Sequence, residues 1–139
     1  MTSDLIEKYK KTGKSQLSVM EVDYGSVSKY GVIEIGKKSR SVKSIVEKPS
    51  ALNAPSNLVS IGRYVLTADI FNIIRGLNPG VGDEIQLTDA LSVQASQGKL
   101  ESVKLEGKRF DCGSMRGFIE AIIYKAKREY PAFMDLDEI

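Results

Sequence analysis

One predicted β-strand, which ends in an acid–base pair, limits the possible folds of this chain most. β-Branched residues recur over residues 42–46 and favour a pleated, buried surface. Pro49 ends this strand, because proline cannot donate a hydrogen bond to a β-ladder. Glu47 and Lys48 therefore lie at the carboxyl end of a strand, which is where open α/β sheets bind their ligands.

The pair formed by Glu47 and Lys48 has two interpretations. A glutamate carboxylate can accept two hydrogen bonds from a sugar diol, and a lysine ammonium can neutralise a phosphate. The alternative is an ordinary exposed ion pair at a strand end, which binds nothing. These two residues alone leave both interpretations open.

Composition excludes several classes of function. The chain has 139 residues, enough for one domain with one core. Its 20 basic and 18 acidic side chains give a net charge of +2, so we expect no nucleic-acid partner. The sequence has no histidine, which removes the commonest general base and the commonest metal ligand. Any enzyme built on it must work by positioning and electrostatics, with oxygen ligands for a metal.

The single cysteine and the distribution of apolar residues suggest a cellular setting. Cys112 alone can form neither an internal disulfide nor a thiolate zinc cluster, which suits the reducing cytoplasm. No apolar run approaches the roughly 20 residues of a membrane span, so we expect no membrane partner. We predict that Cys112 is a small packed residue.

Helical and strand patterns alternate along the chain and predict an α/β fold. Ser3 and Thr67 are predicted helix N-caps, and Gly62 is predicted to break a strand. Gly31 stands beside a strand, which indicates either a bulge or close approach of the backbone to another group. The predicted helices are 3–13, 68–75 and 85–97, with Leu87 buried and with Gly13 and Gly98 ending the first and the third. The stretch from Asp23 to Ser28 is predicted to be a loop that leads to Tyr30. The predicted strands are 17–22, 32–35, 42–46, 58–66 and 103–105, of which 32–35 and 42–46 form a hairpin.

A last helix follows a turn that carries a carboxylate. Ser114 is the predicted cap, and Asp111 lies in a glycine-containing turn just before it. Asp111 is either a turn residue or a ligand of a magnesium ion that also contacts phosphate. Six apolar residues then repeat at helical spacing, and we predict that all six are core: Met115, Phe118, Ile119, Ile122, Ile123 and Ala126.

Six short motifs follow one another in a fixed order. They are KYGVI (29–33), VEKP (46–49), APSNL (54–58), GRY (62–64), EIQLTDA (84–90) and RFDCGS (109–114). Each is weak alone, but together they closely resemble the bacterial UTP–glucose-1-phosphate uridylyltransferases, from about Leu5 to Glu129. The resemblance covers only the second half of such an enzyme, since the family's glycine-rich phosphate loop has no counterpart here.

The resemblance implies a fold, a reaction and a metal. The expected fold is the C-terminal half of a Rossmann-like nucleotide-diphospho-sugar transferase, with a mixed sheet and flanking helices. Residues 1–129 would be the sugar-phosphate-binding half of the domain, and 130–139 a short acidic tail. The reaction would transfer UMP from UTP to glucose 1-phosphate, giving UDP-glucose and pyrophosphate. Asp111 would be a catalytic residue and one of two aspartates that bind Mg²⁺.

The resemblance also implies individual roles at the sugar site. Glu47 would bind the glucose hydroxyls, and Lys48 would be a catalytic and substrate-binding residue that contacts the phosphate of glucose 1-phosphate. Gly31 would let its backbone approach the sugar. Gly62 and Arg63 would line or support the same site.

Other functions remain open at this point. The chain could be a non-catalytic module that binds a sugar phosphate or the full enzyme, or a relative that transfers a thymidylyl or adenylyl group. We expect the isolated chain to be inactive without a nucleotide-binding half, and to form a homo-oligomer. The polar residues at 84–89 would support the site or contact another subunit.

Overall fold

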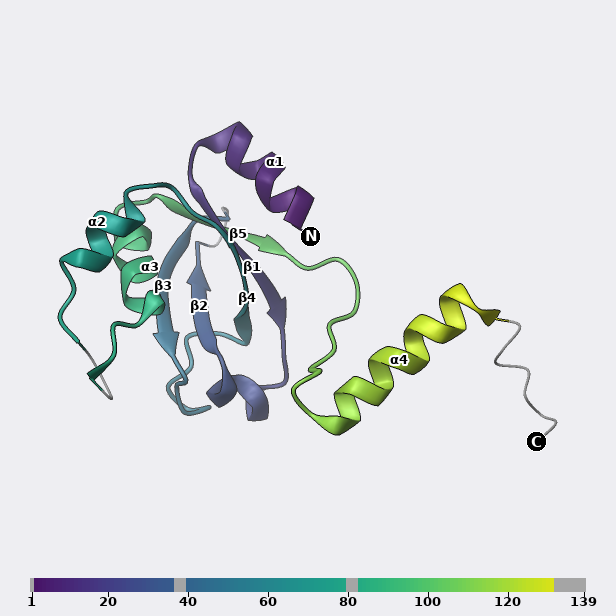
Figure 1. Ribbon diagram of the computed structural model, residues 1–139. Helices are drawn as coiled ribbons and strands as arrows, with labels where there is room; N and C mark the ends of the chain where they lie inside the picture. The colour runs from purple at the N-terminus through teal and green to yellow at the C-terminus, as the bar shows by residue number, and fades with distance from the viewer. Residues whose placement is uncertain (1, 37–39, 80–82, 132–139) are drawn as a thin grey trace. The chain divides into compact units, whose positions relative to one another are not determined.

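The structure, a computed structural model, describes residues 2–36, 40–79 and 83–131 (Figure 1). It contains two compact units, Met1–Glu106 and Gly107–Ile139, and each is described by itself below. Most of the predicted tail, residues 132–139, lies outside the described residues. No helix in the described ranges combines the length and the apolar character needed to span a membrane.

The first unit is built on a five-stranded mixed sheet, with strand order β3-β2-β4-β1-β5 (Figure 1). β1 and β5 pair in parallel, and the other neighbouring pairs are antiparallel. This arrangement confirms the predicted mixed α/β sheet. The strands are β1 (Ser15–Glu21), β2 (Gly31–Ile35), β3 (Val42–Glu47), β4 (Leu58–Val65) and β5 (Leu100–Lys104).

The predicted hairpin is formed by β2 and β3, which pair antiparallel in one register. Val32 pairs with Val46, and Gly31 pairs with Glu47. The first residue of β2 therefore lies directly opposite the last residue of β3. Residues 37–39 of the predicted turn lie outside the described residues.

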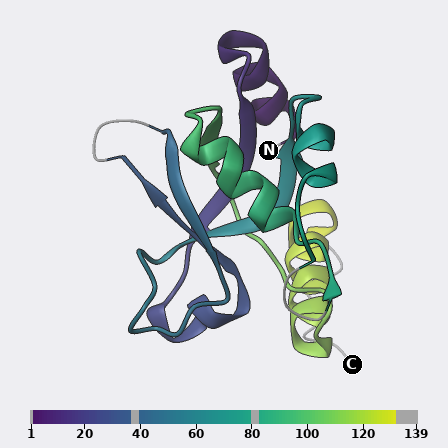
Figure 2. The ribbon, with the colours of Figure 1, turned by 90° about the vertical axis from the view of Figure 1, so that its left-hand side faces the viewer.

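Helices border the sheet (Figure 2). Apolar side chains from the strands and from α2 and α3 form the larger of two clusters of buried residues in the part of the chain that the structure describes. Leu17, Ile33, Leu91 and Leu100 are each at most 2% exposed. Figure 2 shows α2 and α3 side by side along the sheet. The helices of this unit are α1 (Thr2–Thr12), the 3₁₀ helix η1 (Tyr24–Lys29), α2 (Ile70–Arg75) and α3 (Leu87–Ser96).

Helix starts differ from the sequence predictions, whereas two helix ends agree. Ser3 lies inside α1, and Asp69, not Thr67, is the N-cap of α2. Thr67 fails as a cap because its hydroxyl donates to the Asp69 carboxylate. Gly13 and Gly98 both have positive φ directly after the last turns of α1 and α3, as expected for glycine helix ends.

Two further predictions in the first unit were wrong in detail. Leu87 is 37% exposed because it is the first residue of α3, ahead of the buried positions Ala90 and Leu91. Residues 24–29, predicted as a loop, form η1, where Val27 is fully buried. Val27 packs against Val32 and Val59. The polar residues around Val27 in the sequence give no sign of this packing.

The second unit consists of a turn and α4 (Met115–Glu129). Ser114 is its N-cap, as predicted, with the Gly117 amide donating to Ser114 Oγ at 3.1 Å. The predicted core was wrong: five of the six apolar residues are 43–75% exposed, namely Met115, Phe118, Ile119, Ile122 and Ile123. The periodicity identified the apolar face of α4 correctly, but a periodic pattern does not specify which surface covers that face.

Candidate functional site

Glu47 is the last residue of β3, and its carboxylate is tied to a helix start. Thr88 Oγ1 donates a hydrogen bond of 2.9 Å to Glu47 Oε2. Thr88 is the second residue of α3, so a side chain from a helix meets a side chain from a strand end. The Glu47 side chain is 38% exposed, which leaves part of the carboxylate accessible to a ligand.

Gly31 provides the space that the Glu47 carboxylate occupies. A Cβ atom added at Gly31 would lie 3.1 Å from Glu47 Oε2, closer than ordinary van der Waals contact. The sequence predicted close approach to a glycine here, and the group that approaches is Glu47 of the neighbouring strand. This contact gives Gly31 a part in shaping the candidate site.

Lys48 continues directly from Glu47 in an unusual backbone conformation. Its φ is +45°, in the left-handed region that non-glycine residues rarely adopt. A hydrogen bond of 3.0 Å from its amide to the Tyr30 carbonyl holds this conformation. Lys48 Nζ lies 3.9 Å from Glu47 Oε1, longer than a hydrogen bond, and its side chain is 66% exposed. The ammonium is therefore available to an anion beside Glu47.

Gly62 and Arg63 lie in an irregularity of β4. The register with β1 shifts between the pairs Leu17–Tyr64 and Val19–Ser60, and Gly62 has φ +79° within this bulge. β4 continues through Gly62, so the predicted strand break is instead a bulge within one strand. The Arg63 guanidinium donates to Thr2 Oγ1 of α1 at 2.8 Å, and its carbonyl accepts from Ser18 at 2.9 Å. These contacts tie Arg63 to α1 and β1, and its role in sugar binding stays a prediction.

In the second unit, Asp111 lies in the tight turn that the sequence predicted. Its Oδ1 accepts a hydrogen bond of 3.3 Å from the Gly113 amide, and its carbonyl accepts from the Ser114 amide at 3.1 Å. A Cβ atom at Gly117 would lie 2.2 Å from the Asp111 carbonyl oxygen, so glycine is required where α4 packs on the turn. This packing fixes the backbone of Asp111 and leaves the residue exposed.

Asp111 has the chemistry of a magnesium ligand. Mg²⁺ is typically bound by one or two carboxylates, with water and substrate phosphate completing its shell. An exposed carboxylate on a fixed turn fits that requirement. Across residues 2–36, 40–79 and 83–131, no group of three or more acidic, cysteine or histidine side chains is close enough to hold a metal by itself.

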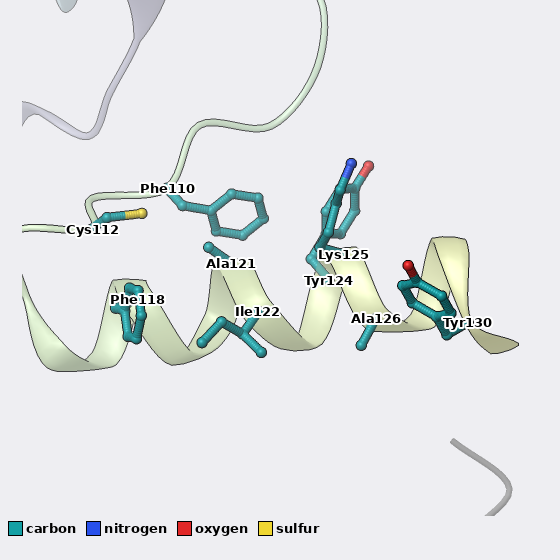
Figure 3. Close-up of a pocket in the computed structure, with 9 residues that line it drawn as sticks. All are labelled: Phe110, Cys112, Phe118, Ala121, Ile122, Tyr124, Lys125, Ala126 and Tyr130. Carbon is teal, nitrogen blue, oxygen red and sulfur yellow. The ribbon is translucent and has the colours of Figure 1, made fainter. Parts of the chain in front are cut away.

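Cys112 and α4 line an open apolar groove of about 550 Å³ (Figure 3). Cys112 is exposed, so the prediction that it is packed was wrong. Figure 3 shows Phe110 of the turn reaching over α4, and its ring lies 5.2 Å from that of Tyr124. The thiol is exposed because the turn carries it over an apolar helix face that remains largely uncovered.

A partly buried polar network lies elsewhere in the first unit and holds α3 in place. Gln94 is fully buried and donates to Thr67 Oγ1 at 2.9 Å and to Asp69 Oδ1 at 3.0 Å. Lys99 Nζ lies 3.0 Å from Asp69 Oδ2. Hydrogen bonds from Thr67 and then from Lys99 hold the pKa of Asp69 below its ordinary value. The network links the start of α2 to the last turns of α3.

Sequence reasoning found most of these residues but not their contacts. It selected Glu47, Lys48, Gly31 and Asp111 individually, and the structure brings Gly31 and Glu47 together within the first unit. It did not predict the hydrogen bond between Thr88 and Glu47. The signal for Thr88 was the excess of polar residues at 84–89, more than helix capping alone requires.

Comparisons to known proteins agree with the observed fold. A family model described as nucleotidyl transferase matches residues 2–128, so the chain belongs to the nucleotidyl transferase family, a class of enzymes. Among its curated relatives are UTP–glucose-1-phosphate uridylyltransferases. That of Pseudomonas aeruginosa is 47% identical over 122 residues, and that of Haemophilus influenzae is 42% identical over 125 residues. Each match covers 86% of this chain, but only 44% and 42% of those proteins.

Solved structures give the same result. A UDP-glucose pyrophosphorylase complexed with UDP-glucose superposes with a TM-score of 0.81 at 43% identity, over 91% of this chain and 49% of that one. The UTP-bound UGPase from Acinetobacter baumannii has a TM-score of 0.79 at 29% identity, over 97% of this chain and 50% of that one. The resemblance predicted from the six motifs is confirmed, and the chain spans about half the length of these proteins.

Proposed function

We propose that this chain provides the sugar-phosphate site and one magnesium ligand of a UTP–glucose-1-phosphate uridylyltransferase. The observation that carries the proposal is the arrangement at the end of β3. There, one carboxylate and one ammonium stand side by side, with a threonine hydroxyl on the carboxylate. These groups match the hydroxyls and the phosphate of glucose 1-phosphate. UTP and UDP-glucose would be partners of the whole enzyme, which would be cytoplasmic.

The proposed reaction needs charge neutralisation more than proton transfer. An oxygen of the sugar phosphate attacks the α-phosphorus of UTP; the new P–O bond forms as the bond to pyrophosphate breaks. This nucleophile is already an anion, so no general base is required, in agreement with the absence of histidine. Glu47 would accept the glucose hydroxyls, and Lys48 would neutralise the phosphate. Gly31 would keep room for the carboxylate, while Gly62 and Arg63 would support the site.

Mg²⁺ is the metal that we propose for the whole enzyme. When bound, it would neutralise charge on the phosphates of the nucleotide. From this chain, Asp111 would hold it through its exposed carboxylate, which the turn before α4 keeps in a fixed backbone position.

A second candidate function is a non-catalytic module that binds sugar phosphate. The observation that favours it is that the carboxylate, the ammonium and the threonine hydroxyl at the end of β3 all come from this chain. A thymidylyl- or adenylyl-transferring relative would use the same strand-end site. The sugar-phosphate site is common to all of these functions, so it is the feature to test first.

Calorimetric titration of the chain with glucose 1-phosphate tests this site. We expect weak binding, which Glu47→Gln reduces by about tenfold or more, because one carboxylate oxygen becomes an amide that cannot accept hydroxyl hydrogen bonds. The matched control is Glu34→Gln. Glu34 also lies on the hairpin and has a lysine close by, Lys43, at 3.5 Å. Equal affinity of Glu47→Gln and the wild type would exclude Glu47 from the sugar site.

A further inference from the structure

We infer that Thr88 is a positioning residue, which holds the Glu47 carboxylate in the orientation that receives the sugar hydroxyls. This inference rests on the proposed function and adds a residue to it. Thr88 and Glu47 are 41 residues apart in sequence, and the 2.9 Å hydrogen bond between them joins two different elements. A hydrogen bond to an ionised carboxylate is about twice as strong as one between neutral groups, so it can select one side-chain orientation.

The Thr88 hydroxyl is presented by a helix that is locked against the sheet. One turn further along α3, the Ser92 hydroxyl lies 3.3 Å from the Ile45 carbonyl oxygen of β3 and 2.9 Å from the Thr88 carbonyl oxygen. Thr88 and Ser92 therefore lie on the face of α3 that packs along β3. Ala90 and Leu91 are buried on the same helix, so α3 cannot rotate without exposing them.

Glu47 Oε2 is also restricted from the opposite strand. Gly31 leaves only enough space for this oxygen, since an added Cβ atom would lie 3.1 Å from it. The oxygen is thus held beside Gly31 and hydrogen-bonded to Thr88. The other carboxylate oxygen, Oε1, lies 3.9 Å from Lys48 Nζ. One oxygen of Glu47 is anchored, and the other is presented next to the proposed phosphate-binding group.

The Thr88 hydroxyl retains its capacity to accept hydrogen bonds. Its single hydrogen is used on Glu47 Oε2, and among the described residues no donor is seen on its oxygen lone pairs. Two acceptors, Thr88 Oγ1 and the Glu47 carboxylate, thus occur together, which is the pattern that neighbouring sugar hydroxyls recognise. Preorganising the carboxylate in this way removes the cost of ordering a glutamate side chain when the sugar binds.

The test compares Thr88→Val, which keeps the shape but removes the hydroxyl, with Thr88→Ser, which keeps the hydroxyl. By calorimetry on the full chain, we expect Thr88→Val to weaken glucose 1-phosphate binding by about tenfold, the loss of one hydrogen bond to a charged group. Thr88→Ser should restore affinity to within about twofold of the wild type. Inorganic phosphate, which probes Lys48 without a sugar, should bind both variants as it binds the wild type.

A control on the same helix separates positioning from folding. Ser96→Ala removes a hydroxyl that donates to the Val93 carbonyl within α3, and it should leave glucose 1-phosphate affinity unchanged. Equal glucose 1-phosphate affinity of Thr88→Val and the wild type would overturn this inference alone. The proposed function would still stand if Glu47→Gln lowered that affinity. Parallel loss of phosphate and glucose 1-phosphate binding in Thr88→Val would also overturn it. If the wild type binds no glucose 1-phosphate, the proposed function fails, and this inference fails with it.

Discussion

The backbone of Lys48 lies in the left-handed region, at φ +45°, immediately before Pro49. A non-glycine residue in this region carries a steric cost of roughly 1–2 kcal/mol, which the surrounding structure must offset. Strain of this kind concentrates at binding and catalytic sites, where a side chain is held in a direction that relaxed backbone would not give. At Lys48, the strained backbone sets the direction in which the lysine side chain leaves the strand end, directly after Glu47.

Two substitutions at Lys48 separate the strain from the ammonium. Lys48→Gly relieves the strain, and Lys48→Ala keeps it, while both remove the charge. We expect Lys48→Gly to be more stable than Lys48→Ala by about 0.5–1 kcal/mol in urea unfolding, since glycine adopts positive φ freely but has more entropy to lose. Both variants should bind inorganic phosphate less tightly than the wild type. Equal stability of the two variants would show that Lys48 is not strained.

At the scale of elements, the polar network around Asp69 makes the packing of α2 and α3 sensitive to acid. The folded chain holds the pKa of Asp69 below its ordinary value of 3.8, first through the Thr67 hydrogen bond and then through Lys99. The unfolded chain therefore binds more protons than the folded chain between the two pKa values. The stabilisation is fully present above the unfolded pKa and is lost as the pH falls through the folded pKa.

Asp69→Asn should remove this part of the acid sensitivity. We expect its free energy of unfolding to fall less than that of the wild type as the pH drops below about 4, because the variant has no carboxyl to protonate at this position. Thr67→Val, which keeps the carboxyl but removes the largest cause of its lowered pKa, should behave similarly. Urea unfolding across this pH range measures both. Identical pH profiles for Asp69→Asn and the wild type would contradict the role of the network.

At the scale of the whole molecule, the second unit presents an apolar face of α4 that the other described residues of that unit leave exposed. Phe118, Ile119 and Ile122 are 47–51% exposed, and the groove beside them is lined mainly by apolar side chains. Large exposed apolar patches favour association, because burying them releases ordered water. We therefore expect the isolated chain to self-associate through α4.

Ile122→Glu should shift the chain toward monomer, since it places a charge in the middle of the apolar face. Leu52→Glu is the matched control: Leu52 is 97% exposed but stands outside α4, in the loop after β3. Sedimentation velocity over a range of concentrations should show association of the wild type and of Leu52→Glu, and less of it for Ile122→Glu. A monomeric wild type, or equal association of all three, would rule out α4 as the contact.

Local sequence signals determined much of this protein. The β-branched run before Glu47, the glycine helix ends and the Ser114 cap each depend on residues that are close in sequence, so the pattern alone predicted them. The candidate residues Glu47, Lys48 and Asp111 were found for the same reason, since each stands at the end of a recognisable local pattern. The six motifs in order placed the chain in its family before any contact was known.

Only the tertiary structure decided which of these residues meet. Gly31 lies opposite Glu47 because the hairpin adopts one register, and Thr88 reaches Glu47 because α3 packs along β3. Both contacts depend on how separate elements pack, and the sequence pattern of one element does not contain that information. The exposure of α4 has the same origin: amphipathic spacing specifies an apolar face, whereas covering that face requires a second surface.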